Sequence, residues 1–321
     1  MSLLLLNYKT YSNYHISLLK KKFDKIHLKD FKKKKNLINF LKKKNKEKDN
    51  IKAIFLSFGI FYDKDVFNLL DDNCYLVSPT TSLTHLKTID LKKNQKLIYL
   101  DRKNFGKKLA NIPSTAELTV ALILALYKKI YSSIKDVKKN FWNRENFVGN
   151  QLLNKKLGII GMGRIGKIVS NIMKSFNLKI YYFDKKKIKY KKFQKKSLKY
   201  IFSNCDIISV HLDSSLSNYG IIKKKYFNLM KKKSIFINTS RGELIDENAL
   251  LNVLKRGKIS GAGLDVLTGD GVWENNKFRH KLVDFSKKHD NLIITPHIGG
   301  NTSEASYLTK KMIIKKLLSY F

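Results

Sequence analysis

A glycine-rich run from Leu157 to Gly166 is the feature that most constrains how this chain can fold. The run begins as a short apolar strand, and residues 164–176 then place their apolar side chains on one helical face. A second apolar run at 178–183 ends in Asp184. This order of strand, glycine turn, helix, strand and acid predicts a βαβ unit, and therefore a parallel sheet.

The glycines of this run are spaced as the binding of a dinucleotide requires. Gly161 allows the tight turn, Gly163 lets the backbone approach a pyrophosphate, and Gly166 lets the helix pack closely on its strand. The helix starts with Arg164 and Ile165, and its first turn offers free N–H groups to an anion. A glycine turn alone is often an ordinary turn, but in this context we predict that these five residues contact a dinucleotide.

Asp184 indicates which dinucleotide binds. It lies eighteen residues beyond Gly166, where a carboxylate can accept hydrogen bonds from a ribose 2′-hydroxyl and repel a 2′-phosphate. Lysines 185–187 follow directly, so that use of NADP is an alternative. We predict NAD as the cofactor.

The chain is strongly basic, with 65 Lys and Arg against 25 Asp and Glu and a net charge of +40. Such a balance is typical of proteins that bind nucleic acid or an anionic membrane surface. Only six of the basic residues are Arg. Proteins that recognise bases and phosphates specifically favour Arg over Lys. The lysines are also spread along the chain in many short runs. We interpret the charge as a bias of composition and expect neither a nucleic acid nor a membrane partner.

The cysteines and apolar runs bear on the compartment. Cys74 and Cys205 match no paired metal or redox spacing, and we expect two reduced thiols and no metal site. The apolar run at 3–6 is too short for a membrane span and is predicted to be a buried strand. These features predict a soluble, cytoplasmic protein.

The length of 321 residues predicts two domains. From Leu157 onward, apolar strands alternate with helical patterns, which predicts a Rossmann-like, doubly wound parallel sheet with its ligand at the carboxyl ends of the strands. The predicted strands are 157–160, 178–183, 206–211, 234–238, 261–267 and 292–295.

The first hundred residues repeat this alternation less distinctly, which predicts a smaller, flavodoxin-like α/β domain. Its predicted strands lie near 2–6, 52–57, 74–77 and 96–100. A closing helix at 303–321 could cross back to this domain. We therefore assign residues 1–112 with 302–321 to a substrate domain and residues 113–301 to the NAD-binding domain.

Three further segments follow predicted strands, at the edge where a nicotinamide and its substrate would meet. Arg241 has the planar fork that suits a two-point hold on a carboxylate, although a surface salt bridge is the alternative. Asp265 could bind the carboxamide of a nicotinamide. Asp270 could hold a histidine in the correct tautomer, or it could serve only a turn between two glycines. His297 follows an apolar strand and a proline and is the candidate general acid and base.

Two more residues are candidate cofactor contacts. His211 ends a predicted strand, although a structural role is an equal alternative for it. Thr239 directly follows the strand that leads to Arg241.

These residues occur in an order that resembles the D-isomer-specific 2-hydroxyacid dehydrogenases. The resemblance is specific from about Pro113 to Asn301. It is carried by Gly161, Gly163, Gly166, Asp184 and the segments 238–242, 263–266 and 295–300. The last of these segments is similar to the phosphoglycerate dehydrogenase branch.

The resemblance implies hydride transfer between NAD(H) and C2 of a 2-keto or D-2-hydroxy acid. His297 would act as general acid and base, with Arg241 on the substrate carboxylate. Backbone N–H groups near Ser57, Phe58 and Gly59 would complete the carboxylate site. The resemblance also implies a homodimer, with which the apolar helix predicted at 118–131 is consistent. The alternative is that this helix is buried within its own domain.

Two departures from the family pattern affect these expectations. The family usually has Glu where Asp270 stands, so the contact with His297 is expected to be longer or bridged by water. The loop Leu56–Phe61 lacks the Arg-Ser-x-Thr pattern associated with phosphorylated substrates, which makes phosphoglycerate a poor candidate. A rival function is an NAD-responsive corepressor whose basic surface binds nucleic acid.

Overall fold

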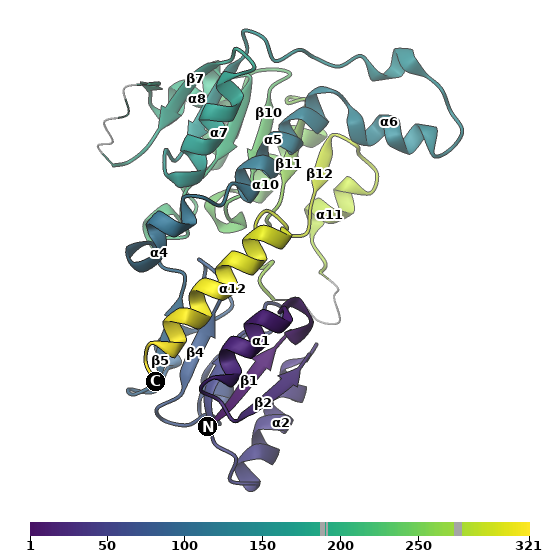
Figure 1. Cartoon of the computed structure of the whole chain (residues 1–321). Coiled ribbons are helices and arrows are strands. Elements are labelled where there is room, and N and C mark those ends of the chain that lie inside the picture. The colour runs from purple at the N-terminus through teal and green to yellow at the C-terminus, as the bar shows by residue number, and fades with distance from the viewer. Residues whose placement is uncertain (187–189, 191, 273–277) are drawn as a thin grey trace. The chain divides into compact units, whose positions relative to one another are not determined.

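The computed structural model describes residues 1–186, 190, 192–272 and 278–321, and the chain forms two compact units (Figure 1). The first unit contains Met1–Asn111, Gly271–Phe278 and Thr302–Phe321, and the second contains Ile112–Asp270 and Arg279–Asn301. The chain therefore also changes unit directly after Asp270. The predicted domain limits do not include this excursion.

The first unit is built on a parallel sheet of five strands in the order β2-β1-β3-β4-β5. The strands are β1 (Ser2–Leu6), β2 (Lys25–Lys29), β3 (Ile51–Phe55), β4 (Tyr75–Ser78) and β5 (Lys96–Tyr99). The helices are α1 (Asn13–Lys20), α2 (Lys34–Lys46), α3 (Lys64–Phe67), α4 (Arg102–Leu109) and α12 (Ser303–Leu318), with 3₁₀ turns η1 (Tyr8–Thr10) and η2 (Thr88–Asp90). The C-terminal helix α12 packs on α1, β4 and β5 of this unit.

The central strand β1 and the edge strand β2 of this sheet differ in burial, as their sequences predict. The leucines of β1, Leu3–Leu6, are buried, as expected of a central parallel strand covered on both faces. At the sheet edge, β2 reads Lys-Ile-His-Leu-Lys, and lysines protect an open edge from pairing with another chain. β2 is absent from the predicted strands because this lysine-rich pattern carries little apolar signal.

The second unit is built on a parallel sheet of seven strands in the order β12-β11-β10-β9-β6-β7-β8. The strands are β6 (Lys156–Ile160), β7 (Lys179–Phe183), β8 (Gln194–Lys195), β9 (Ile207–Val210), β10 (Ile235–Asn238), β11 (Gly261–Leu264) and β12 (Leu292–Ile294). The helices are α5 (Ser114–Tyr127), α6 (Ile130–Val137), α7 (Arg164–Lys174), α8 (Leu198–Asn204), α9 (Lys224–Leu229), α10 (Glu247–Lys255) and α11 (Lys281–Ser286), with 3₁₀ turns η3 (Arg144–Phe147), η4 (Leu216–Asn218) and η5 (Gly242–Leu244).

The strand order of this sheet reverses at β6, which pairs with β7 on one side and β9 on the other. In doubly wound sheets the ligand binds at the carboxyl ends of the strands beside such a reversal. The glycine turn follows β6, so it lies at that point. The predicted fold class, with two Rossmann-like units and a flavodoxin-like strand order in the smaller one, is confirmed.

The apolar helix predicted at 118–131 ends earlier than expected and is mostly buried. α5 stops at Tyr127, and Lys129 adopts left-handed backbone (φ 53) before α6 begins. The buried side chains of α5, among them Leu122 and Ile123, face α7, β10 and β11 of the same unit. These contacts bear out the alternative that the helix is buried within its own unit.

Within the described part of the chain, no single helix combines the length and apolar character that a membrane span requires. Lys103–Leu109 and Ser114–Tyr127 reach that length and apolar character only when the two helices are counted together.

Candidate active site

The glycine turn has the geometry of a cradle for an anion. Gly161 has a φ of 98°, and a Cβ there would lie 2.6 Å from the carbonyl oxygen of His211. A Cβ on Gly166 would lie 2.2 Å from the carbonyl oxygen of Gly161. A Cβ on Gly163 would meet no atom within 4 Å, so this glycine faces open space. The turn is therefore tightly packed at its two ends and open in the middle, where a pyrophosphate would approach.

The start of α7 leaves its N–H groups unoccupied by a side-chain cap. Gly163 is the N-cap residue, and it has no side chain to accept from the first turn. The guanidinium of Arg164 donates to the carbonyl of Ile112 at 2.7 Å, and Ile165 packs against the core of the unit. The backbone of these two residues, rather than their side chains, is thus what the turn presents to a ligand.

Asp184 lies beside this turn, directly after β7. Its Oδ2 accepts from the N–H of Met162 at 2.9 Å, and its Oδ1 accepts from the N–H of Lys186 at 2.9 Å. The ammonium of Lys185 donates to the carbonyl of Ser217. Lys187 lies outside the described residues. The acid is therefore held at the glycine turn, as a partner for a ribose would be.

His211 and Thr239 are bound to neighbours within the unit. Nε2 of His211 lies 2.9 Å from Oγ of Ser209, and its Nδ1 has no hydrogen-bond partner among the described residues. Burial lowers the pKa of His211 to about 3, so the ring is neutral. Oγ1 of Thr239 lies 2.8 Å from Oγ1 of Thr119, which ties the end of β10 to α5. Contact of either side chain with a cofactor stays a prediction.

Arg241 follows β10 and is largely enclosed. Its guanidinium donates to the carbonyl of Ser240. Burial lowers the pKa of Arg241, while the nearby carboxylates of Asp270, Glu243 and Asp265 act in the opposite direction. The guanidinium is thus a cation surrounded by acids of its own unit.

The backbone after Arg241 packs against the segment that carries Asp270. A Cβ on Gly242 would lie 2.1 Å from the carbonyl carbon of Leu267 and from the nitrogen of Thr268. No other residue type fits at this crossing. Gly242 therefore allows two loops from different strands to bring Arg241 and Asp270 into one neighbourhood.

Asp265 anchors the turn that contains His297. Its buried carboxylate accepts from the hydroxyl of Thr295 at 2.6 Å and from the N–H groups of Ile298 and Gly299 at 2.8 and 2.7 Å. Burial raises the pKa of Asp265, and these hydrogen bonds lower it in part. His297 itself adopts left-handed backbone (φ 55), which is rare for a non-glycine residue and is often found at functional sites.

The side chains of His297 and Asp270 form a direct pair. Nδ1 of His297 lies 3.0 Å from Oδ2 of Asp270, which also accepts from the N–H of Leu267 at 3.1 Å. The expectation of a longer or water-bridged contact is wrong, because the loop brings the shorter carboxylate within hydrogen-bond distance. Asp270 serves the turn and the histidine together. A proton held on Nδ1 leaves Nε2 as the nitrogen that exchanges protons.

The predicted carboxylate donors of the first unit are already hydrogen-bonded in part. The N–H of Ser57 donates to Oη of Tyr62 at 3.1 Å, and the N–H of Gly59 donates to the carbonyl of Gly271 at 3.2 Å. The ring of Phe58 lies 4.7 Å from that of His85. The N–H groups of Ser57 and Gly59 thus serve the loop itself in this structure, and their role towards a substrate stays a prediction.

A polar loop at the neighbouring strand end was not among the predicted site residues. β4 pairs with β3, so its carboxyl end lies at the same sheet edge as Ser57. Oγ of Ser78 lies 2.8 Å from Oγ1 of Thr80, which donates to the carbonyl of Ser82. His85 is buried with its Nδ1 unpaired among the described residues, and burial lowers the pKa of His85 to about 4. The rare proline in Ser-Pro-Thr-Thr was the available sequence signal.

The fold and this site define a two-unit α/β protein with a dinucleotide-binding sheet. Residues 120–299 match the family described as "D-isomer specific 2-hydroxyacid dehydrogenase, NAD binding domain". The chain belongs to this family, and NAD is the cofactor of its second unit.

The curated relatives of the chain are dehydrogenases and reductases. This chain is 39% identical over 217 residues to an aromatic 2-oxoacid reductase of Clostridium sporogenes. The match covers 63% of this chain and 65% of that protein. It is 35% identical over 204 residues to a D-3-phosphoglycerate dehydrogenase of Haemophilus influenzae, covering 63% of this chain and 48% of that protein. The chain thus matches about half to two thirds of these relatives' length. Neither name supports the corepressor alternative.

Solved structures match the whole chain. An acyclic imino acid reductase in complex with NADPH and D-Arg superposes with a TM-score of 0.79 at 25% identity, covering 100% of this chain and 97% of that one. The pyruvate reductase of Chlamydomonas reinhardtii superposes with a TM-score of 0.82 at 20% identity, covering 100% and 96%, which shows the fold alone.

Proposed function

We propose that the protein is an NAD-dependent oxidoreductase that transfers a hydride between NAD(H) and C2 of a D-2-hydroxy or 2-keto acid. The observation that carries this proposal is the direct pair of His297 and Asp270, in the same unit as the glycine turn and beside the loop of Arg241. A binding protein without turnover has no need of a histidine oriented by a carboxylate.

The residues of the second unit fit NAD. The open face at Gly163, the uncapped start of α7 and the placement of Asp184 match a pyrophosphate and its ribose. When bound as NADH, the cofactor supplies the hydride. The remaining chemistry falls to the side chains that follow the strands.

Proton transfer is assigned to Nε2 of His297. It donates a proton to the oxygen that becomes the hydroxyl and removes that proton in the reverse direction. Asp270 holds Nδ1 and stabilises the ring when it is positively charged. Arg241 binds the substrate carboxylate, and its enclosed position strengthens this attraction, because the interior screens charge less than water does.

An unphosphorylated substrate suits the first unit better than phosphoglycerate. The loop after β3 has Leu56 where the phosphate-binding pattern has Arg, and this leucine is 4% exposed. The adjoining loop after β4 presents hydroxyls in place of cations. Among relatives, the aromatic 2-oxoacid reductase and a hydroxypyruvate reductase of Thermotoga maritima are named for substrates without phosphate.

Steady-state oxidation of NADH with a panel of 2-keto acids tests this function. We expect turnover with at least one unphosphorylated 2-keto acid and slower turnover with NADPH. Arg241→Ala should lower kcat/KM by a hundredfold or more, about the loss of 3 kcal/mol, while the melting temperature changes little. Absence of turnover with every keto acid and both cofactors, in a folded protein that binds NADH, would overturn the assignment.

We also propose that the protein is a dimer. The segment that begins with α6 and reaches Trp142 forms the contact. This segment extends away from the sheet of its unit in Figure 1. Its exposed apolar side chains include Ile134 and Val137, each 50% exposed, and Trp142, 86% exposed. Exposed apolar patches of this kind mark interaction surfaces. Light scattering should give twice the chain mass, and Trp142→Ser combined with Ile134→Ser should shift the protein towards the monomer.

The cytoplasm is the proposed location. Cys74 and Cys205 are buried free thiols, and burial raises the pKa of Cys205 to about 12, which keeps it protonated and unreactive. Cell fractionation would check this proposal.

A further inference from the structure

The turn that carries Asp270 is closed by its own hydrogen bonds. The N–H of Asp270 donates to the carbonyl of Leu267 at 3.1 Å, and Oδ2 of Asp270 accepts from the N–H of Leu267 at 3.1 Å. These bonds fix the shape of the turn but not its place beside the sheet. The chain leaves the second unit directly after Asp270 and re-enters it at Arg279. The place of the turn therefore depends on contacts with other segments of the second unit.

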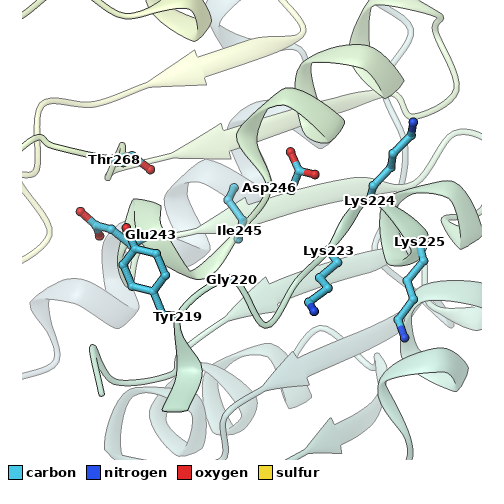
Figure 2. Close-up of a pocket in the computed structure, with 9 residues that line it drawn as sticks. All are labelled: Tyr219, Gly220, Lys223, Lys224, Lys225, Glu243, Ile245, Asp246 and Thr268. Atoms are coloured by element: carbon cyan, nitrogen blue, oxygen red, sulfur yellow. The ribbon is translucent and has the colours of Figure 1, made fainter. Parts of the chain in front are cut away.

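Two glutamates bind the backbone of this turn. The N–H of Thr268 donates to Oε1 of Glu247 at 2.9 Å, and the N–H of Gly269 donates to Oε1 of Glu243 at 3.3 Å. Figure 2 shows Thr268 and Glu243 on the same side of the hollow that they line. The shorter of the two bonds comes from Glu247, which is the first residue of α10. This helix therefore provides the closer anchor for the turn.

The second oxygen of Glu247 is bound by His280. Nε2 of His280 lies 3.1 Å from Oε2 of Glu247, and the two side chains are only 12% and 10% exposed. Nδ1 of His280 accepts from the N–H of Leu282 at 3.2 Å, where it caps α11. Because Nδ1 is an acceptor there, a neutral His280 carries its ring hydrogen on Nε2 and donates it to Glu247. Both oxygens of Glu247 thus have a fixed donor.

The position of this pair along the chain connects it to the reaction. An enclosed pair of His and Glu can serve stability alone. Thr268, however, stands two residues before Asp270, and His280 is the second residue after the chain re-enters the unit. Glu247 therefore binds the chain on both sides of the segment that leaves the second unit. A small shift of the turn would take Asp270 out of hydrogen-bond distance of His297, which lies 3.0 Å away.

We propose that Glu247 is a positioning residue for the proton transfer. It holds the turn through the N–H of Thr268 and so keeps the carboxylate of Asp270 against Nδ1 of His297, while His280 holds Glu247 in place. Glu247 acts through Asp270 and needs no contact with substrate or cofactor. This inference rests on the proposed function, because it concerns the orientation of the general acid.

Glu247→Gln is the sharpest test, because the amide has the size of the carboxylate but only one oxygen. That oxygen can accept from Thr268 or from His280, and the NH₂ group then faces the other donor. We expect kcat to fall at least about tenfold, while KM for the keto acid stays within about threefold. His280→Asn keeps a side-chain cap for α11 and should lower kcat by about threefold or more.

Two measurements on the free protein need no substrate. The ring nitrogens of ¹⁵N-labelled histidines are observed by NMR, and a His297→Asn variant identifies the signals of His297. We expect a proton on Nδ1 of His297 in the wild type and a partial loss of this signal in Glu247→Gln. Amide hydrogen exchange at Thr268 should become at least about tenfold faster in that variant. These readouts judge the role of Glu247 separately from the proposed function.

Asp246→Ala is the matched control at the start of the same helix. Oδ1 of Asp246 caps α10 by accepting from the N–H of Ala249 at 2.9 Å. Loss of this cap should lower the melting temperature, while kcat stays within about twofold and the ring signals of His297 do not change. Wild-type ring signals of His297 in Glu247→Gln would overturn the proposal. An equal loss of kcat in Asp246→Ala and Glu247→Gln would also overturn it, because the effect would then be general destabilisation.

Discussion

Oδ2 of Asp270 lies 3.0 Å from Nδ1 of His297, although the two residues are carried by separate segments of the chain. Asp270 follows β11, and His297 follows β12 in a turn that the carboxylate of Asp265 anchors. Because β11 and β12 are parallel neighbours, their carboxyl ends meet at the same edge of the sheet. Strand order therefore brings the carboxylate to the imidazole.

Asp270→Asn should lower kcat by a hundredfold or more while the fold is kept. An amide can donate to Nδ1, which favours the wrong tautomer and no longer stabilises a charged ring. Asp270→Glu restores the carboxylate and should retain most of the activity. Steady-state kinetics and melting temperatures of both variants check this. An Asp270→Asn enzyme with more than a tenth of the wild-type kcat would contradict it.

Gly163→Ala should weaken NADH binding, whereas Gly166→Ala should lower the stability of the fold. A Cβ on Gly163 points into open space, so the variant should remain folded but bind NADH at least about tenfold more weakly. A Cβ on Gly166 meets the carbonyl oxygen of Gly161 at 2.2 Å, so that variant should lose about 1–3 kcal/mol of unfolding free energy. Denaturant unfolding and fluorescence titration with NADH separate the two effects. Similar stability losses in both variants would count against this account of the turn.

Asp184→Ser should shift cofactor preference towards NADPH by about tenfold or more. The change removes the negative charge that repels a 2′-phosphate and an acceptor for the ribose hydroxyls. The measurement is the ratio of kcat/KM for NADH and NADPH. Lys186→Gln is the control and should leave the ratio close to that of the wild type. A wild-type preference for NADPH would refute the role of Asp184.

Asp49 should make stability depend on pH in the acid range. Burial raises the pKa of Asp49, but hydrogen bonds from Lys25 and Ser2 outweigh this and lower it to about 2. The pKa of an unfolded Asp is about 3.9. Its stabilisation is therefore complete above about pH 4 and is lost as the pH falls through about 2.

Asp49→Asn should lower the denaturation midpoint at pH 7 and flatten its fall between pH 4 and 2. Urea unfolding across that range is the measurement. Asp72→Asn removes an exposed partner of Lys92 and should change little, because exposed ion pairs contribute little to stability. Identical pH profiles for wild type and Asp49→Asn would show that the carboxylate is not selectively stabilised in the folded state.

Some misses at the level of the fold have a common physical origin. β2 is an edge strand that joins the sheet by backbone pairing with β1. Its lysine-rich sequence gives no sign of that pairing. The apolar run at 118–131 was consistent with a dimer contact or with burial in its own domain, and the structure buries most of α5 while the exposed apolar side chains lie in and after α6. A local sequence pattern indicates that a segment is apolar. Which element packs against that segment depends on distant parts of the chain.

The βαβ unit, the glycine turn and the acids and cations that follow the strands could all be predicted from the sequence. These depend on periodicity and on short spacings, which are local properties of the chain. The direct contact of Asp270 with His297 and the hydrogen bond from the N–H of Gly59 to the carbonyl of Gly271 are known only from the three-dimensional structure. The reason is that each contact joins residues far apart in sequence, so its distance is set by strand order and packing.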